Sequence, residues 1–188
     1  MRDMGWFAAG YGGLGGFLAV EAAVRAPGSA SSLAASGADE GTTRAIVIAG
    51  AVSAGLAPLV RLLRLRRMPG AAGPLGVSLQ AVGLGLRLWA MMTLRAAYTR
   101  TLRTSDDQPT VARGPYAVIR HPGYLGSLLV WVGFALTSRS PAVVVLAGGL
   151  IGRAYARRIA VEERLLERDL PGYQDYARRT RRLIPYVW

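Results

Sequence analysis

Apolar residues gather into five segments along the chain, near 5–25, 44–63, 74–95, 124–138 and 140–160. Each segment is close to, or a little shorter than, the roughly 20 residues with which an α-helix crosses a bilayer. The fourth is short and meets the fifth through the sequence SRSP, which predicts a tight helical hairpin. The pattern therefore predicts an all-α fold, an integral membrane helical bundle of about five transmembrane helices.

The polar stretches divide this pattern into two regions. Residues 26–43 are small and polar and are predicted to form a flexible loop, and residues 96–123 connect the third segment to the fourth. We therefore expect an N-terminal region of three membrane helices, 1–95, and a C-terminal cytoplasmic catalytic region, 96–188. Two glycine pairs, Gly12 with Gly16 and Gly148 with Gly152, lie in apolar segments. Their small-xxx-small spacing is typical of closely packed helices.

Composition supports a membrane protein. The chain is 52% apolar, its mean hydropathy is +0.27, and its formal charge is +12. All 23 basic residues are arginine, which is typical of a GC-rich genome and suggests a bacterium. They crowd the ends of apolar runs, as contact with anionic lipid requires, and do not form the basic face of a nucleic-acid-binding module. With no Cys and one His, disulfides, thiolate chemistry and a metal site are not expected.

The arginines also predict a topology. With five alternating spans, the loops 26–43 and 96–123 and everything after residue 160 share one side, and most arginines lie there. Because positively charged loops stay in the cytoplasm, this side of the bacterial membrane is predicted to be cytoplasmic and to hold the active site. The RLLRLRR cluster at 61–67 opposes the assignment, since it falls on the other side, but it is outnumbered.

Arg87 lies midway through the third apolar segment, where an unpaired charge is costly. Such a residue normally faces the bundle interior or water. Two roles are open for it: a structural ion pair with Glu21 across the bundle, or a contact with the substrate.

The stretch GPYAVIRHPGYLG, residues 114–126, holds the only histidine of the chain. Its two prolines forbid a regular helix throughout, and its glycines permit tight turns, so an ordered loop leading into the fourth segment is expected. Backbone groups freed in this way must be buried in protein or line a polar cavity. Tyr116, His121 and Tyr124 add an aromatic wall with polar atoms, which suits a nucleoside; an interfacial aromatic belt is the alternative.

A second polar group follows the fifth segment, in RAYARRIAVEERLLERDL. Arg158 and Glu162 are four positions apart and share a helix face, and Tyr155 lies on the same face as Arg158. A surface salt bridge explains the pair equally simply. The tail that follows, PGYQDYARRTRRLIPYVW, either folds back as a lid or lies on the membrane as an aromatic and basic anchor.

Three motifs in this order and spacing, GPYAVIRHPGYLG, RIAVEERLL and GYQDYARRTRRLIP, resemble the catalytic region of the isoprenylcysteine carboxyl methyltransferase family and, more loosely, the phospholipid N-methyltransferases. The resemblance covers roughly residues 96–188. It implies an integral membrane enzyme that takes S-adenosylmethionine from the cytosolic side and a lipophilic substrate from the bilayer. One departure is visible in the tail, where PGY stands in place of the family's FG-x-x-Y spacing.

The resemblance also implies roles for single residues. Arg158 is placed on the substrate side as the catalytic residue. Arg87 stays a second candidate for substrate binding because of its position in the third apolar segment, independently of the resemblance. The expected cofactor-binding residues are Tyr116, His121, Pro122, Gly123, Tyr124 and Glu162 by motif, and Gln108, Pro109, Thr110 and Val111 by spacing.

Methyl transfer from a sulfonium is an in-line displacement, which needs alignment and exclusion of water but no metal or protein nucleophile. An arginine on the substrate side matches a carboxylate, or stabilises a phenolate or enolate oxygen. A carboxylate or hydroxyl acceptor of the isoprenylcysteine type is therefore expected. A phospholipid amine and polyketide lipids such as alkylpyrones or alkylresorcinols remain open as alternatives.

Two other classes of function are weighed against the methyltransferase. A non-catalytic membrane scaffold would explain the arginines and aromatic residues but would leave the three motifs as coincidences. A reductase of related fold would use NADPH, and a comparison of cofactor binding separates it from a methyltransferase.

Overall fold

The computed structural model describes residues 2–23, 39–63, 67–94 and 111–185, and every regular element within these ranges is helical. This confirms the all-α class. The elements are α1 (Arg2–Ala23), α2 (Thr42–Leu62), α3 (Ala72–Leu94), the 3₁₀-helix η3 (Gly114–Ala117), α4 (Pro122–Thr137), α5 (Pro141–Asp169) and α6 (Tyr173–Arg179).

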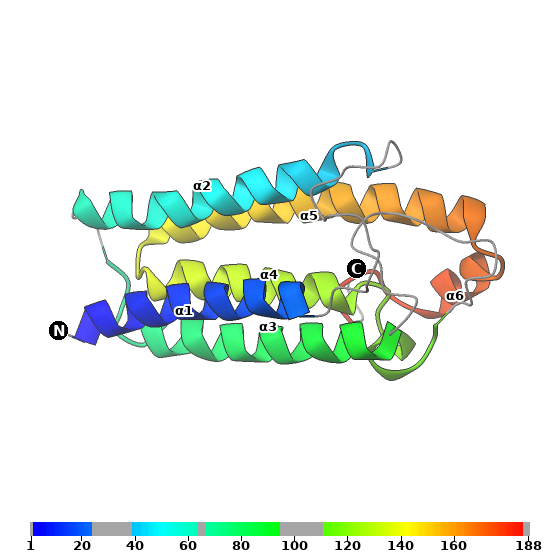
Figure 1. The fold of residues 1–188 in the computed structure, drawn as a ribbon, viewed down its shortest axis with the longest axis horizontal. Helices are drawn as coiled ribbons and strands as arrows, with labels where there is room; N and C mark the ends of the chain where they lie inside the picture. Colours follow the sequence, from blue (N-terminus) through cyan, green and yellow to red (C-terminus); the bar gives the residue numbers. More distant parts are fainter. Residues whose placement is uncertain (1, 24–38, 64–66, 95–110, 186–188) are drawn as a thin grey trace.

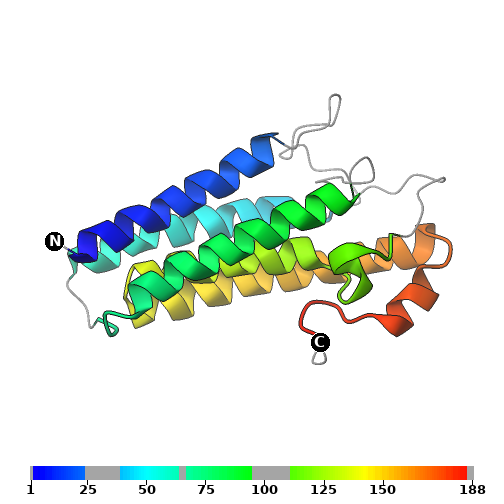
Figure 2. The same cartoon turned by 90° about the horizontal axis from the view of Figure 1, so that it is seen from below.

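The five long helices lie side by side in an elongated bundle (Figure 1). Helices α2 and α5 pair along one side, and α1, α3 and α4 pack together on the other. Figure 2 shows the same bundle turned by 90°, with η3 and α6 both at the end where α5 finishes. Successive helices alternate in direction, so the start of α2, the end of α3 and the start of α4 meet at this end.

The expected hairpin is confirmed, and two helix bounds differ from those expected. Helix α4 begins at Pro122 because proline fits the first helical position, where its missing N–H leaves no hydrogen bond unmade. The expected loop therefore ends at His121, and Tyr124 lies in the first turn of a helix. Helix α5 starts where the Ser140 hydroxyl caps the amide of Val143, and it continues past the apolar segment to Asp169.

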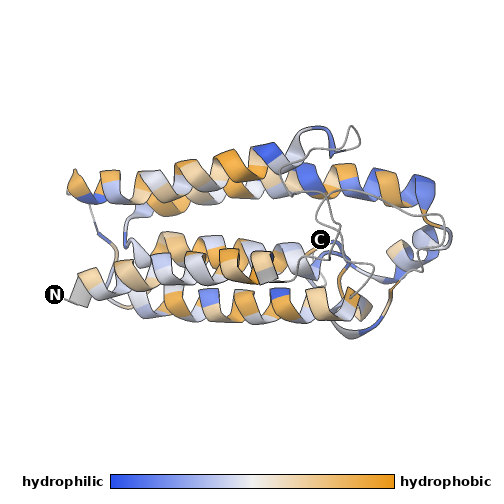
Figure 3. Cartoon of the chain, in the orientation of Figure 1, coloured by the Kyte–Doolittle hydropathy of each residue, from blue (hydrophilic) through white to orange (hydrophobic). Residues whose placement is uncertain are grey.

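Two helices, α2 and α3, are long and apolar enough to cross a membrane among the residues described, and α4 is a shorter apolar helix. The predicted number of five spans is not confirmed by this criterion. Figure 3 shows hydrophobic residues along the length of the bundle and hydrophilic ones concentrated towards the end that holds α6. Large apolar side chains are exposed on four of the long helices: Met4 and Leu18 on α1, Val47, Ile48, Val52 and Leu59 on α2, Leu75, Val82, Trp89 and Met92 on α3, and Val145, Leu146 and Leu150 on α5.

Four glycines bring the backbones of α3 and α4 into direct contact. A Cβ atom on Gly83 would lie 2.5 Å from the carbonyl oxygen of Gly126, and one on Gly76 would lie 2.5 Å from that of Gly133. Both helices space their glycines seven residues apart, and the helices are antiparallel, so the two pairs meet in register. No side chain fits at these points.

The glycine spacing noted in the sequence is not the one that packs. A Cβ on Gly12, Gly148 or Gly152 would meet nothing within 4 Å, and one on Gly16 would make ordinary contact with Leu84 at 3.7 Å. The prediction of close helix packing at these pairs is therefore wrong within this chain. The reason is that small residues permit close approach but do not select the helix that approaches.

A proline inside α2 frees a carbonyl that forms a hydrogen bond with α1. Pro58 lies inside α2 and has no N–H to donate to the carbonyl of Ala54, one turn earlier. The Tyr11 hydroxyl donates to this carbonyl instead, at 2.6 Å. The carbonyl that proline leaves without its helical partner is thereby satisfied, and the same hydrogen bond links α1 to α2.

We predict that Gly83→Ala destabilises the bundle by about 1–3 kcal/mol, because the added methyl group forces two backbones apart. Gly85→Ala is the matched control on the same helix: a Cβ there meets nothing within 4 Å, and alanine is the better helix former. Thermal unfolding of both variants in detergent measures the difference. Equal midpoints would show that α3 and α4 are not held by this contact.

Candidate active site

The functional residues predicted from the motifs meet where α4 starts and α5 leaves the apolar part of the bundle. Gly114, with a φ of 58°, turns the chain into η3, and His121 then precedes α4. The His121 ring stacks on that of Tyr124, with centroids 5.6 Å apart and planes inclined by 13°. Pro122 is buried beside them, and the carbonyl of Gly123 faces α3.

Tyr124 links the two motifs. Its hydroxyl donates to Glu162 Oε2 at 2.5 Å and accepts a hydrogen bond from Arg158 Nε at 3.0 Å. The Glu162 carboxylate also lies 4.0 Å from His121 Nδ1. The register of α5 thus turns Arg158 and Glu162 towards the start of α4, as their spacing of one helical turn allows.

Arg158 is buried, with 3% of its surface exposed, and its guanidinium is held from the opposite side by the start of α2. Nη1 forms an ion pair with Asp39 and donates to Thr42 Oγ1 at 3.0 Å and to Thr43 Oγ1 at 2.9 Å. A buried arginine is tolerable because its charge and donors are matched in this way.

Asp39 is the residue that sequence reasoning missed, since it belongs to the stretch expected to be a flexible loop. It is fully buried, accepts hydrogen bonds from the Thr42 hydroxyl at 2.7 Å and from the Thr43 amide at 3.0 Å, and precedes α2, which begins at Thr42. Burial raises the pKa of its carboxyl, but these hydrogen bonds and the Arg158 charge outweigh burial and lower it. The sequence signal at this point is the polar stretch DEGTT at 39–43, which lies just before an apolar run and contains the first residues of α2.

The neighbouring Glu163 has a different task from Glu162. Its carboxylate accepts hydrogen bonds from Arg120 Nε at 2.7 Å and Arg182 Nε at 2.6 Å, and it lies 3.3 Å from His121 Nε2. Burial raises the pKa of Glu163, but the contacts with His121 and Arg120 outweigh it and bring the pKa down to about 2. Glu163 therefore joins α5, the loop and the tail.

The C-terminal tail folds back onto the loop, which is the first of the two arrangements predicted for it. The amides of Arg120 and His121 donate to the carbonyls of Arg181 and Arg182, at 2.7 and 3.0 Å. In α6, the Tyr176 hydroxyl donates to the carbonyl of Tyr116 at 2.8 Å. Whether the tail moves as a lid stays a prediction.

Arg87 approaches the site from α3. It forms an ion pair with Glu21, and its Nη1 donates to the Gly123 carbonyl at 2.9 Å and to the Ser127 hydroxyl at 2.8 Å. The ion pair with Glu21 is the structural role, one of the two roles open for Arg87. Its contact with a substrate stays a prediction.

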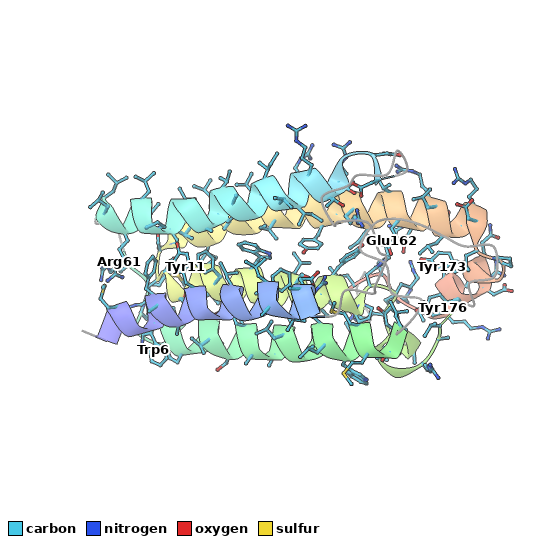
Figure 4. The ribbon with its side chains drawn as sticks, in the orientation of Figure 1. Trp6, Tyr11, Arg61, Glu162, Tyr173 and Tyr176 are labelled. Carbon is cyan, nitrogen blue, oxygen red and sulfur yellow. The ribbon has the colours of Figure 1, made fainter. Side chains whose placement is uncertain are left out.

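Of the remaining residues predicted to bind the cofactor, some lie outside the described ranges. Gln108, Pro109 and Thr110 lie outside the described residues, and Val111 is half-buried at the first described position before the loop. Tyr116 is buried, with 9% of its surface exposed. Figure 4 places Glu162, Tyr173 and Tyr176 towards one end of the bundle and Trp6, Tyr11 and Arg61 towards the other.

We predict that Glu163 stabilises the fold through its charge. Because its pKa in the folded protein lies below the ordinary 4.5, this stabilisation, on the order of 3 kcal/mol, is present above about pH 4.5 and is lost as the pH falls towards 2. Glu163→Gln should lower the unfolding midpoint at neutral pH and converge with wild type at low pH.

Asp175→Asn is the control, because Asp175 forms an exposed pair with Arg178 and such pairs contribute little. A constant difference between Glu163→Gln and wild type from pH 7 to pH 2 would contradict the assigned role.

Comparison with known proteins connects this site to a family. The model of the phospholipid methyltransferase family matches residues 72–171, just over half of the chain. Among curated proteins, the chain is 35% identical to the cobalt-zinc-cadmium resistance protein CzcN of Cupriavidus metallidurans, over 60% of this chain and 47% of that one. It is 29% identical to protein-S-isoprenylcysteine O-methyltransferase B of Arabidopsis thaliana, over 60% of this chain and 58% of that one.

The chain therefore spans about half the length of these curated relatives. Among solved structures, the eukaryotic intramembrane Ras methyltransferase ICMT (isoprenylcysteine carboxyl methyltransferase) has a similar fold, with a TM-score of 0.63 and 22% identity, over 75% of this chain and 52% of that one. These matches confirm the resemblance inferred from the motifs. Because the family model matches more than half of the chain, including the helices that carry Tyr124, Arg158 and Glu162, the chain belongs to the phospholipid methyltransferase family.

Proposed function

We propose that the protein is a membrane methyltransferase that transfers a methyl group from S-adenosylmethionine to a lipophilic acceptor. The observation that carries this proposal is the contact of Tyr124 with both Arg158 and Glu162 inside the region of the family match. Through this contact the Tyr124 hydroxyl joins Arg158, which is expected on the substrate side, to Glu162, which is expected on the cofactor side.

The residues at the site fit such a cofactor. S-adenosylmethionine carries a sulfonium charge, an ammonium group and ribose hydroxyls, and these need carboxylates and aromatic faces. Of the two adjacent glutamates, Glu162 has 25% of its side chain exposed and Glu163 only 5%, so Glu162 is the one that can accept hydrogen bonds from a ligand. The stacked rings of His121 and Tyr124 offer an aromatic surface next to it.

A buried polar atom nearby supports the same location. The Tyr173 hydroxyl has no hydrogen-bond partner among the residues that the structure describes, although Tyr173 is 3% exposed. Burial raises the pKa of Tyr173 strongly, and the charge of Glu163 adds to the increase, so this hydroxyl stays protonated and can donate. Such an orphaned donor fits a ligand that brings an acceptor atom.

When bound, S-adenosylmethionine supplies the methyl group on its sulfonium sulfur. The chain itself provides alignment: the Arg158 guanidinium fixes the Tyr124 hydroxyl, and that hydroxyl fixes the Glu162 carboxylate. The tail, held by Glu163, covers the loop and excludes water on this side. The exposed apolar faces of α2, α3 and α5 match a membrane location, from which a lipophilic acceptor arrives laterally. The cytoplasmic orientation of the site and a bacterial source stay predictions.

The direct test combines binding and transfer. Purified protein in detergent is titrated with S-adenosylmethionine and, in parallel, with NADPH, and labelled methyl transfer into a lipid extract of the source cells is then followed. Binding of S-adenosylmethionine and label in an extractable lipid are expected. Binding of NADPH alone would favour the reductase, and binding of neither would favour the scaffold.

We predict that Glu162→Gln weakens binding of S-adenosylhomocysteine by about 1–3 kcal/mol, because a carboxylate that accepts from the ligand's hydroxyls or ammonium becomes a neutral amide. Calorimetric titration measures the change. Glu167→Gln, at an exposed position of the same helix, is the control and should bind like wild type. Unchanged affinity in Glu162→Gln would move the cofactor away from this carboxylate.

We predict that Arg158→Lys leaves S-adenosylhomocysteine affinity nearly unchanged and lowers the rate of methyl transfer into the lipid extract by roughly ten- to a thousand-fold. Lysine cannot reach Tyr124, Thr42 and Thr43 with one planar group, so the hydroxyl of Tyr124 loses its position.

Arg157→Lys is the control, since Arg157 is exposed and donates only at 3.3 Å to the Glu40 carbonyl. Loss of cofactor binding in Arg158→Lys would assign Arg158 to the cofactor pocket instead.

A further inference from the structure

The guanidinium expected to meet the acceptor already has a carboxylate of the chain against it. Asp39 is 0% exposed and Arg158 is 3% exposed, and the two form an ion pair. The carboxylate is held in place independently, by the hydroxyl of Thr42 at 2.7 Å and the hydroxyl and amide of Thr43 at 3.1 and 3.0 Å. Asp39 is therefore oriented towards Arg158 by the first two residues of α2, Thr42 and Thr43.

The polar groups around Arg158 come from three parts of the chain. The residues just before α2 bring the Asp39 carboxylate, α4 brings the neutral Tyr124 hydroxyl, and α5 brings the Glu162 carboxylate, which lies one turn along from Arg158 and is joined to the same hydroxyl. Among the described residues, two carboxylates thus surround one guanidinium. A third carboxylate, arriving on an acceptor, would meet a site whose fixed charge is already negative.

The threonines strengthen this arrangement. Arg158 Nη1 donates to both threonine hydroxyls, and these hydroxyls in turn contact the Asp39 carboxylate, so ion pair and hydroxyls form one closed network. An acceptor carboxylate that displaced Asp39 would leave a buried carboxylate without its counter-ion, which is strongly unfavourable.

We propose that Asp39 is a specificity-determining residue that occupies the position of an acceptor carboxylate, so that the site takes lipophilic acceptors whose nucleophile is an uncharged hydroxyl or amine. The proposal rests on the methyltransferase function proposed above and narrows its substrate class. It favours the hydroxyl over the carboxylate among the oxygen acceptors expected from the sequence, and it gives Arg158 the task of fixing the Tyr124 hydroxyl beside the Glu162 carboxylate.

The test compares two ligands that differ only in their head group. Protein in detergent, with and without S-adenosylhomocysteine, is titrated calorimetrically with octanoate and with octanol, and titrations into detergent alone are subtracted. Wild type, Asp39→Asn and Glu40→Gln are compared. Glu40 is the matched control, because it is the next residue and its side chain pairs on the surface with Arg164.

Wild type and Glu40→Gln are expected to bind octanol at least tenfold more tightly than octanoate. Asp39→Asn keeps the shape of the side chain but removes its charge, so octanoate affinity should rise ten- to a hundredfold and the preference for octanol should shrink by the same factor. Tighter binding of octanoate than octanol by wild type overturns the proposal, and so does a folded Asp39→Asn that gains no octanoate affinity. Should Asp39→Asn not fold, the order in wild type decides alone.

The same titrations separate this proposal from the function it rests on. If S-adenosylhomocysteine does not bind, the methyltransferase assignment fails, whatever the order of the two ligands. If it binds and octanoate is preferred by wild type, the methyltransferase stands and the assignment of Asp39 falls.

Discussion

The direct contact of the α3 and α4 backbones at four glycines is the constraint on which the rest of the structure depends. It fixes the height of α4 against α3, because Gly76 and Gly83 meet Gly133 and Gly126 at only one register. With this register, Arg87 lies one turn beyond Gly83 and reaches the carbonyl of Gly123 at the start of α4. The loop with His121 is thereby held at one end of an apolar bundle.

The polar network around Arg158 extends this constraint to the N-terminal helices. The family match begins at residue 72, yet the carboxylate that pairs with Arg158 belongs to Asp39, three positions before α2 begins. Helix α2 packs along α5, so its first turn is carried to the height of Arg158. The N-terminal region, which carries no recognised motif, thus contributes a contact to the motif residue Arg158. The division of the chain into regions 1–95 and 96–188 stays a prediction.

Hydropathy predicted much of the fold, because each of the five apolar segments corresponds to one of the five long helices. The helical hairpin and the relation of Arg158 to Glu162 followed from short-range spacing. Asp39 did not, because it lies in a stretch of small and polar residues and its partner is 119 positions away. The packing glycines were also missed, since their spacing is meaningful only once the antiparallel partner of α3 is known.

The division of labour between Glu162 and Glu163 shows why a helical register alone left the site incomplete. Adjacent residues on α5 point about 100° apart. One direction leads to Tyr124, and the other leads to Arg120 and Arg182, which are separated by 62 positions in sequence but brought together by the returning tail. The Glu163 carboxylate therefore holds the loop under the tail. The adjacent Glu162 carboxylate is fixed by Tyr124 but stays partly exposed. A helix that presents two carboxylates in this way combines a structural anion with one that can bind a ligand, and neither can be exchanged for the other without turning α5.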